Sequence, residues 1–299
     1  MGNRVAVITD SISCIPPDLL AKYHIGVIPL NFYANGRVYR DGIDVTPSEA
    51  YTLFLKDPET FRTSGASPQD CVDAYSRPAR ESKDVFSVIL SSKLSAIYST
   101  AEAAGKQVRQ DFPGVNVTVL DSRTAAAAEG FIALAAARAA EEGKGIAEVT
   151  AAAEKVRDEV RIIAYMDTVR CIYRSGRIPR IASVAGSLLN IRPLFTFSGG
   201  VPRFAGAVRS KATGIERLLQ DMDGRVNGHA VRVAVMHVYA EEDAKRLKDM
   251  VQSRFNCSEL WLTEFSPLMG YACGTGTLGL AFYPEDQSTA ASPGITPVS

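Results

Sequence analysis

The chain has 299 residues, of which 46% are hydrophobic and 22% charged, and its 33 basic and 33 acidic side chains leave no formal net charge. This balance is typical of a globular protein with one large or two ordinary domains, and it argues against a nucleic-acid-binding protein that relies on a broad basic field. The five cysteines show no CxxC spacing, which indicates a reducing compartment. The first residues already have a strand pattern, and the longest apolar stretch, residues 131–140, is too short to cross a bilayer. We therefore expect a cytoplasmic protein.

The first half of the chain alternates short apolar runs with helical patterns. We expect strands at residues 5–8, 25–32, 85–90 and 115–120, and Pro29 interrupts the second of these, which suits an edge strand or a bulge. We expect helices at residues 18–23 and 46–55, from 67 onward, from 95 onward, and at 124–142 and 146–159. Thr46 and Ser67 each open a capping box, Asn35-Gly36 is a hairpin-type turn, and residues 63–66 form a small polar loop. The alternation predicts a parallel sheet with right-handed crossovers and helices on both faces.

One junction stands out in this half, at residues 85–104. An apolar run ends at Leu90, two serines follow, and helical spacing begins at Leu94, with Ser95 as the candidate N-cap. A helix start carries unpaired N–H groups and partial positive charge, so the junction is a candidate anion site to which Ser92 and Ser95 add hydroxyl donors. The alternative is that these serines only cap the helix.

Two other predicted strands also end in turns with hydroxyl and aspartate side chains. These turns are residues 9–11 and 121–122. Because ligands of parallel α/β sheets bind beyond the carboxyl ends of the strands, the convergence favours the anion-site interpretation.

The second half begins near Arg161. We expect strands at residues 162–166, 193–197, 201–205, 231–238, 260–265 and 280–283. We expect helices after Asp167 and at residues 182–190, 211–222 and 241–254. Residues 270–279 are rich in glycine but match neither dinucleotide-binding nor P-loop patterns, so we expect a close turn there. The predicted domains are residues 1–160 and 161–283, followed by a disordered tail at 284–299.

The candidate chemistry is that of binding more than of bond breaking. Arg174 and Arg177 flank a glycine in a loop and either clamp an anion or lie in solvent. Ser95 has no GxSxG context, and no histidine is placed as its base by any motif. The three histidines lack metal-ligand spacing, and no pair of carboxylates suggests acid–base catalysis.

Taken together, several segments resemble the DegV family, which are bacterial fatty-acid-binding proteins. The matching segments appear in the family's order at residues 8–11, 63–67, 90–95, 175–178, 186–193 and 274–282. The resemblance covers about residues 4 to 283. It implies an α/β protein of two α/β domains with a long-chain fatty acid such as hexadecanoate in a cleft between them.

The resemblance also implies the site and its partners. The fatty-acid carboxylate is expected at the hydroxyls of Thr63 and Ser95, with no catalytic residue, metal or cofactor. Further candidate head-group or cleft contacts are Ser64, Ser92, Ala96, Arg177 and Gly274. Such proteins can present the acyl group to a separate, dihydroxyacetone-kinase-like fatty acid kinase that makes acyl-phosphate for phospholipid synthesis. The expected partners are therefore a long-chain fatty acid, such a kinase and a transient membrane surface contact, without nucleic acid.

Two departures from the family pattern bear on these expectations. Ser95-Ala96-Ile97 replaces a frequent Ser-Gly-Thr, and Ala272 stands where the family often has histidine. The histidine's role is therefore missing or moved, so lipid binding is better supported than partnership with a kinase. The alternative function is a small hydrolase or phosphotransfer enzyme that uses Ser95 in the same cleft. A base beside Ser95 would favour the enzyme, and a deep apolar tunnel ending at Thr63 and Ser95 would favour the carrier.

Overall fold

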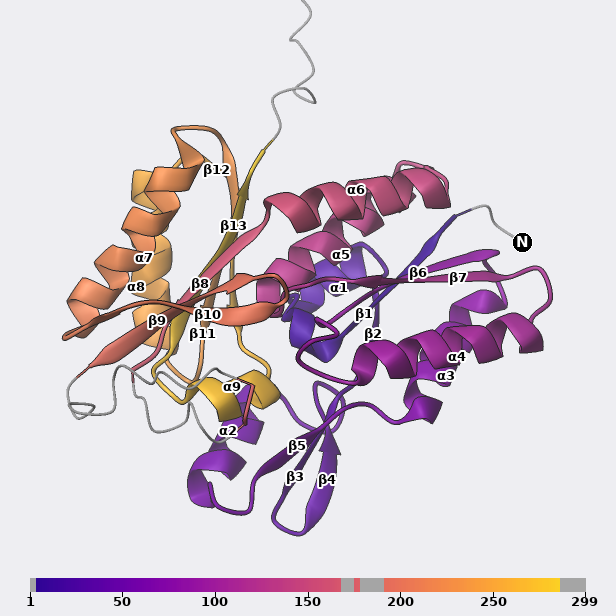
Figure 1. The fold of residues 1–299 in the computed structure, drawn as a ribbon, viewed down its shortest axis with the longest axis horizontal. Coiled ribbons are helices and arrows are strands. Elements are labelled where there is room, and N and C mark those ends of the chain that lie inside the picture. The colour runs from indigo at the N-terminus through magenta and orange to yellow at the C-terminus, as the bar shows by residue number, and fades with distance from the viewer. Residues whose placement is uncertain (1–3, 168–174, 178–190, 286–299) are drawn as a thin grey trace, which may run out of the picture.

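The computed structural model describes residues 4–167, 175–177 and 191–285 (Figure 1). The helices expected after Asp167 and at 182–190 lie outside the described residues, as does most of the expected tail. The last strand runs to Pro284, so the first residue assigned to the tail belongs to a sheet.

A four-stranded parallel sheet is built from the first half of the chain. Its order is β2 (Gly26–Ile28), β1 (Ala6–Asp10), β6 (Asp84–Ile89) and β7 (Asn116–Asp121). Every pairing in it is parallel, which confirms the topology predicted from the alternating pattern. A short 3-10 helix, η1 (Ser11–Ser13), follows β1.

Helices cover both faces of the parallel sheet, as predicted (Figure 1). One face packs against α3 (Pro68–Ala79) and α4 (Ile97–Asp111). The other packs against α1 (Pro17–Lys22), α5 (Ala126–Glu141) and α6 (Ile146–Glu159). The alanine-rich α5 is buried along most of its length, and a Cβ added at Gly130 would lie 2.5 Å from the Ser13 carbonyl oxygen. The small side chains of α5 thus let it run directly against the backbone that follows β1.

A small antiparallel sheet interrupts this pattern. Its order is β4 (Arg37–Arg40), β3 (Asn31–Ala34) and β5 (Arg62–Ser64), and α2 (Pro47–Lys56) packs beside it. The single strand expected at 25–32 is wrong, because β2 and β3 belong to different sheets and Pro29, which lacks an N–H donor, lies between them. The loop expected at 63–66 is also wrong in part, because its first two residues pair with β3.

The second half forms a six-stranded mixed sheet. Its order is β10 (Val201–Val208), β9 (Arg192–Ser198), β8 (Arg161–Tyr165), β13 (Leu278–Pro284), β11 (Val231–His237) and β12 (Cys257–Glu264). β11 and β12 are parallel and joined by α8 (Glu241–Arg254), and the other pairings are antiparallel. α8 and α7 (Lys211–Val226) cover one face of this sheet (Figure 1).

A short helix corrects the glycine-rich turn expected at 270–279. α9 (Pro267–Cys273) contains the first four of those residues, and only the following segment is a turn. Ser266 caps α9 by accepting a hydrogen bond from the Leu268 N–H, and Pro267 occupies the first helical position, where its missing donor is not needed.

The two large sheets share one hydrophobic core. The face of the mixed sheet opposite α7 and α8 packs against α5, where the Phe131 ring lies 5.1 Å from Trp261 and 5.2 Å from Tyr283. The chain is thus an α/β protein with a parallel sheet and a second, mixed sheet, and its division into domains at residue 160 stays a prediction. Within the described ranges, no helix combines the length and apolar character needed to cross a membrane.

Candidate functional site

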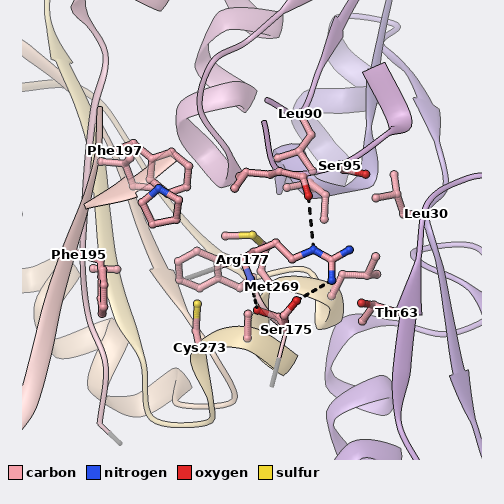
Figure 2. Close-up of a pocket in the computed structure, with 18 of the residues that line it drawn as sticks. Leu30, Thr63, Leu90, Ser95, Ser175, Arg177, Phe195, Phe197, Met269 and Cys273 are labelled. Carbon is pink, nitrogen blue, oxygen red and sulfur yellow. Dashed lines mark hydrogen bonds between the residues drawn. The ribbon is translucent and has the colours of Figure 1, made fainter. Parts of the chain in front are cut away.

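A cavity lies where the carboxyl ends of the parallel strands meet the small sheet and the mixed sheet (Figure 2). Its free space, including the open mouth, is about 960 Å³. The first half of the chain contributes Ile12, Leu30, Thr63, Ser64, Gly65, Leu90, Leu94 and Ser95. The second half contributes Ile162, Ala164, Met166, Ser175, Arg177, Phe195, Phe197, Pro202, Phe265, Leu268, Met269, Ala272 and Cys273.

One side of the cavity is apolar. Phe195 and Phe197 project from β9, and Met269 and Cys273 project from α9 (Figure 2). These two elements come from opposite ends of the second half and meet only in the folded protein. The wall they form suits an apolar chain and offers no charged partner.

The opposite side holds the two hydroxyls expected at the site. Thr63 lies in β5 opposite Phe32 of β3 and is half-buried. Ser95, also half-buried, precedes α4, and a Cβ added at Gly65 would lie 4.0 Å from its Oγ. The fold therefore brings together the two segments that carry Thr63 and Ser95, and both side chains line the same cavity.

The N-cap expected at Ser95 is wrong by one residue. α4 begins at Ile97, and its N-cap is Ala96, which has no side-chain acceptor. A turn closed by the Leu94 N–H and the Ser91 carbonyl, at 2.9 Å, delays the helix start. Ser95 Oγ nevertheless accepts a hydrogen bond from the Ile97 N–H at 3.2 Å. A hydroxyl that accepts in this way keeps its own proton to donate to a ligand.

Arg177 lies beside these hydroxyls, at the exposed side of the cavity (Figure 2). Its Nε donates to the Leu94 carbonyl oxygen at 3.4 Å, and its Nη1 donates to the Ser175 carbonyl oxygen at 2.6 Å. These contacts direct the guanidinium toward the Ser95 loop. A guanidinium so placed can pair with a carboxylate through its remaining N–H groups.

The other expected contacts divide into two groups. Ser64 lines the cavity and is exposed. Ser92, Ala96 and Gly274 do not line it. Ser92 Oγ donates instead to Asp121 Oδ2 at 2.6 Å, and Gly274 ends α9 with a φ of 85°, which favours glycine.

Sequence reasoning missed the apolar lining. Ile12, Leu30 and Leu90 each lie within two residues of the end of a strand of the parallel sheet, and this position was the available signal. The residues of β9 and α9 gave no such signal, because their contribution depends on how the mixed sheet packs against the first half of the chain.

Two buried side chains next to the small sheet, Asp41 after β4 and Tyr51 on α2, form hydrogen bonds with the segment that leads into α9 behind the cavity. Asp41 Oδ2 accepts a hydrogen bond from Ser266 Oγ at 2.6 Å, and Tyr51 Oη donates to the Phe265 carbonyl oxygen at 2.6 Å. Burial raises the pKa of Asp41 to about 6, although hydrogen bonds from Ser266 and Ser11 oppose the shift. These contacts hold the Thr63 side of the cavity against the α9 side.

Among the residues that the structure describes, the cavity lining offers groups for binding and no carboxylate or imidazole that could act as a general base. The lining residues that the structure describes include no His, Asp or Glu, and Ser95 Oγ bonds a backbone N–H rather than a base. Over the same described ranges, no group of three or more His, Cys, Asp or Glu side chains is placed to hold a metal ion. The arrangement can hold an amphipathic ligand with an apolar tail and a small anionic head.

The fold and the site together define an α/β protein with a largely apolar cavity between a parallel and a mixed sheet. The family model "DegV: Uncharacterised protein, DegV family COG1307" matches residues 4–285. The chain belongs to the DegV family.

Individual relatives agree with this assignment. The chain is 30% identical to a DegV domain-containing protein of Clostridium perfringens, over 94% of this chain and 99% of that one. A structure described as fatty acid binding of a DegV family protein from Thermus thermophilus is 30% identical, with a TM-score of 0.85 over 94% of this chain and all of that one. DegV, described as a fatty acid binding protein from Bacillus subtilis, is 26% identical, with a TM-score of 0.86 over 95% of this chain and all of the other.

Proposed function

We propose that this protein binds a long-chain fatty acid of about palmitate length in the cavity between its sheets. The carboxylate lies at Thr63 and Ser95, and the acyl chain lies along the aromatic wall. The observation that carries the proposal is a cavity with an aromatic and apolar wall on one side and hydroxyl groups, among them those of Thr63 and Ser95, beside an arginine on the other. The similar proteins from Thermus thermophilus and Bacillus subtilis, both described as fatty acid binding, support the same ligand class.

The energetics favour such a ligand. Each buried methylene contributes roughly 0.8 kcal/mol, so a palmitate-length tail contributes on the order of 10 kcal/mol before the costs of ordering. A buried carboxylate is unfavourable unless it is hydrogen-bonded, and Thr63, Ser95 and Arg177 supply donors for it. Such a ligand would remain bound through purification.

The carrier interpretation is preferred to an enzyme that uses Ser95. A nucleophilic serine needs a base within hydrogen-bond reach, and the described lining residues offer none. The same hydroxyl is well suited to donate to a carboxylate, because its acceptor side already holds the Ile97 N–H.

We further propose that the protein presents its fatty acid to a dihydroxyacetone-kinase-like fatty acid kinase. Arg177 and Ser64 are exposed, so a head group bound beside them lies within reach of a second protein. Ala272 occupies a position where the family often has histidine, so presentation to a kinase is tested separately from lipid binding.

The protein would take up its fatty acid at a membrane surface. Exposed Arg203 and Phe204 on β10 support this role, because the Phe204 ring lies 6.1 Å from Phe195 of the cavity.

Two experiments test these proposals. Calorimetric titration should show tight binding of palmitate, much weaker binding of hexanoate, and binding of hexadecanol weakened by the loss of the carboxylate. Equal affinity for palmitate and hexanoate would contradict an acyl-chain cavity.

In the second experiment, the protein loaded with fatty acid is mixed with ATP and a bacterial fatty acid kinase catalytic subunit, and acyl-phosphate is trapped with hydroxylamine. No hydroxamate above the lipid-only control would refute the kinase partnership and leave lipid binding intact.

A further inference from the structure

Two carboxyl groups lie side by side beneath the cavity and outside its lining. Asp10 is the last residue of β1 and Glu129 lies on α5, and both side chains are 0% exposed. The titratable groups that interact with them are two carboxyl groups, two thiols and a phenol, none of which carries a positive charge: Asp41, Asp121, Cys14, Cys71 and Tyr75. Among the described residues, no Lys, Arg or His forms an ion pair with either carboxyl group.

Asp10 connects two loops that form the cavity. Its Oδ1 accepts a hydrogen bond from the Ile12 N–H at 2.8 Å, and its Oδ2 accepts one from the Leu90 N–H at 2.9 Å. Ile12 and Leu90 both line the cavity, and the loop after Leu90 continues to Ser95. Asp10 therefore fixes the start of the loop that carries Ser95, and Ser91 and Ser92 hold the same loop further along through Gly200 and Asp121.

Glu129 lies between Thr9 and Asp10. Its Oε1 accepts a hydrogen bond from Thr9 Oγ1 at 3.4 Å, and its carboxyl group is within hydrogen-bond reach of the Asp10 side chain. No donor among the described residues bonds its buried Oε2. Two ionised carboxylates in contact and away from water repel each other strongly, and one retained proton relieves this repulsion. Because Asp10 already accepts two N–H groups, the proton belongs on Glu129, which then donates it to Asp10. Burial, the largest cause, raises the pKa of Glu129 well above its usual range.

We propose that Glu129 is a positioning residue for lipid binding: its carboxyl proton holds the Asp10 carboxylate, and through it the loops at Ile12 and Leu90. This inference rests on the proposed function, because the affinity for fatty acid is its readout. When alkaline pH removes the proton, two buried negative charges face each other, Asp10 moves, and the Ser95 loop loosens. Fatty-acid affinity therefore falls as the pH rises.

The matched variant is Glu129→Gln. The glutamine amide still donates to Asp10 and still accepts from Thr9, but it cannot lose a proton. Palmitate affinity is measured for the parent and for Glu129→Gln in pH steps upward from 7 for as long as both proteins remain folded, and the ligand's own titration is common to both. We expect the parent to lose roughly tenfold in affinity and the variant to change less than twofold. Parallel pH profiles for the two proteins would overturn the proposal.

A second measurement does not depend on ligand. Amide hydrogen exchange at Ile12 and Leu90, corrected for intrinsic rates, should lose protection over the same pH steps in the parent and keep it in Glu129→Gln. Equal protection of the two proteins across that range would overturn the proposal. If neither protein binds palmitate at pH 7, the proposed function fails, while the exchange data still decide the role of the carboxyl pair.

Discussion

The substitution Thr63→Val tests the head-group site most cleanly. Valine keeps the branched shape of threonine and its preference for a strand, and it removes only the hydroxyl. Thr63 Oγ1 makes no hydrogen bond to any residue that the structure describes, so the substitution breaks no described protein contact. The loss should therefore appear in ligand binding and not in folding.

The magnitude follows from the charge on the ligand. A hydrogen bond to a charged group contributes about 1.5–3 kcal/mol, which corresponds to a roughly ten- to hundredfold loss of palmitate affinity. Ser95→Ala should lose affinity to a similar extent. It should also lower the free energy of unfolding by up to about 1 kcal/mol, because Ser95 Oγ accepts the Ile97 N–H at the start of α4. Only Thr63→Val separates binding from stability.

The assay is calorimetric titration with palmitate, together with thermal unfolding of the ligand-free protein. Ser92→Ala is the matched control, because the Ser92 hydroxyl donates to Asp121 and does not line the cavity. Thr63→Ser should retain most of the affinity, since it restores a hydroxyl at the same position. If Thr63→Val and Ser95→Ala both bind palmitate as tightly as the parent, the carboxylate is held elsewhere and the site is wrong.

Three further predictions concern Arg177 at the mouth of the cavity, the buried Asp41 behind it and the packing of α9. Arg177→Gln should weaken palmitate binding by up to about fivefold at low salt, because an exposed ion pair contributes at most about 1 kcal/mol. The same substitution should leave the binding of hexadecanol unchanged. Equal losses of affinity for the two ligands in titrations would contradict a pairing of Arg177 with the carboxylate. The pKa of Asp41 is raised to about 6, so its ionised form destabilises the fold at neutral pH and this penalty disappears as the pH falls. In urea unfolding, the free energy of unfolding of Asp41→Asn relative to that of the parent should therefore decrease by up to about 3 kcal/mol as the pH falls from 7 to 4. A difference between the two proteins that does not change with pH would refute the shifted pKa. Gly270→Ala should lower the free energy of unfolding by about 1–3 kcal/mol, because the added Cβ would overlap the buried Tyr51 ring. Gly224→Ala should raise it by about 0.5–1 kcal/mol, because Gly224 is exposed on α7 with open space around it. Similar effects of the two substitutions on the melting temperature would contradict the close contact of α9 with Tyr51.

Local sequence signals predicted much of the first half of the chain. The capping boxes at Thr46 and Ser67 are confirmed, as is the hairpin turn at Asn35-Gly36, where both residues have the positive φ that such a turn requires. Each of these signals lies within four residues of sequence and depends on backbone geometry alone. The parallel order of the first sheet followed from the alternation of strands and helices.

The errors arose where distant segments decide the structure. Residues 63–64 belong to β5 only because they pair with the edge of β3. The segment is short and polar, so it lacks the alternation of apolar and polar residues that predicts a strand. Residues 270–273 are helical because Ser266 and Pro267 start a helix that packs against Tyr51, which the count of glycines concealed.

The candidate site was predictable in its polar half. Strand-end reasoning and the family resemblance singled out Ser95, and the resemblance alone singled out Thr63; the fold brings both to one cavity. The aromatic wall of Phe195 and Phe197 could not be placed, because its position depends on the packing of two sheets. The buried pair of Asp10 and Glu129 was hidden for the same reason, since 119 residues separate two side chains that meet only in the core.

Mass spectrometry of the ligand carried by the freshly purified protein tests the central claim most directly. The protein is expressed in bacteria, purified without detergent, denatured in organic solvent and extracted, with the Thr63→Val and Ser92→Ala variants processed in parallel. We expect the parent and Ser92→Ala to release a straight- or branched-chain fatty acid near palmitate length in about equimolar amount, and Thr63→Val to release much less. A parent protein that yields no lipid, and that takes up none when palmitate is added, would contradict the account.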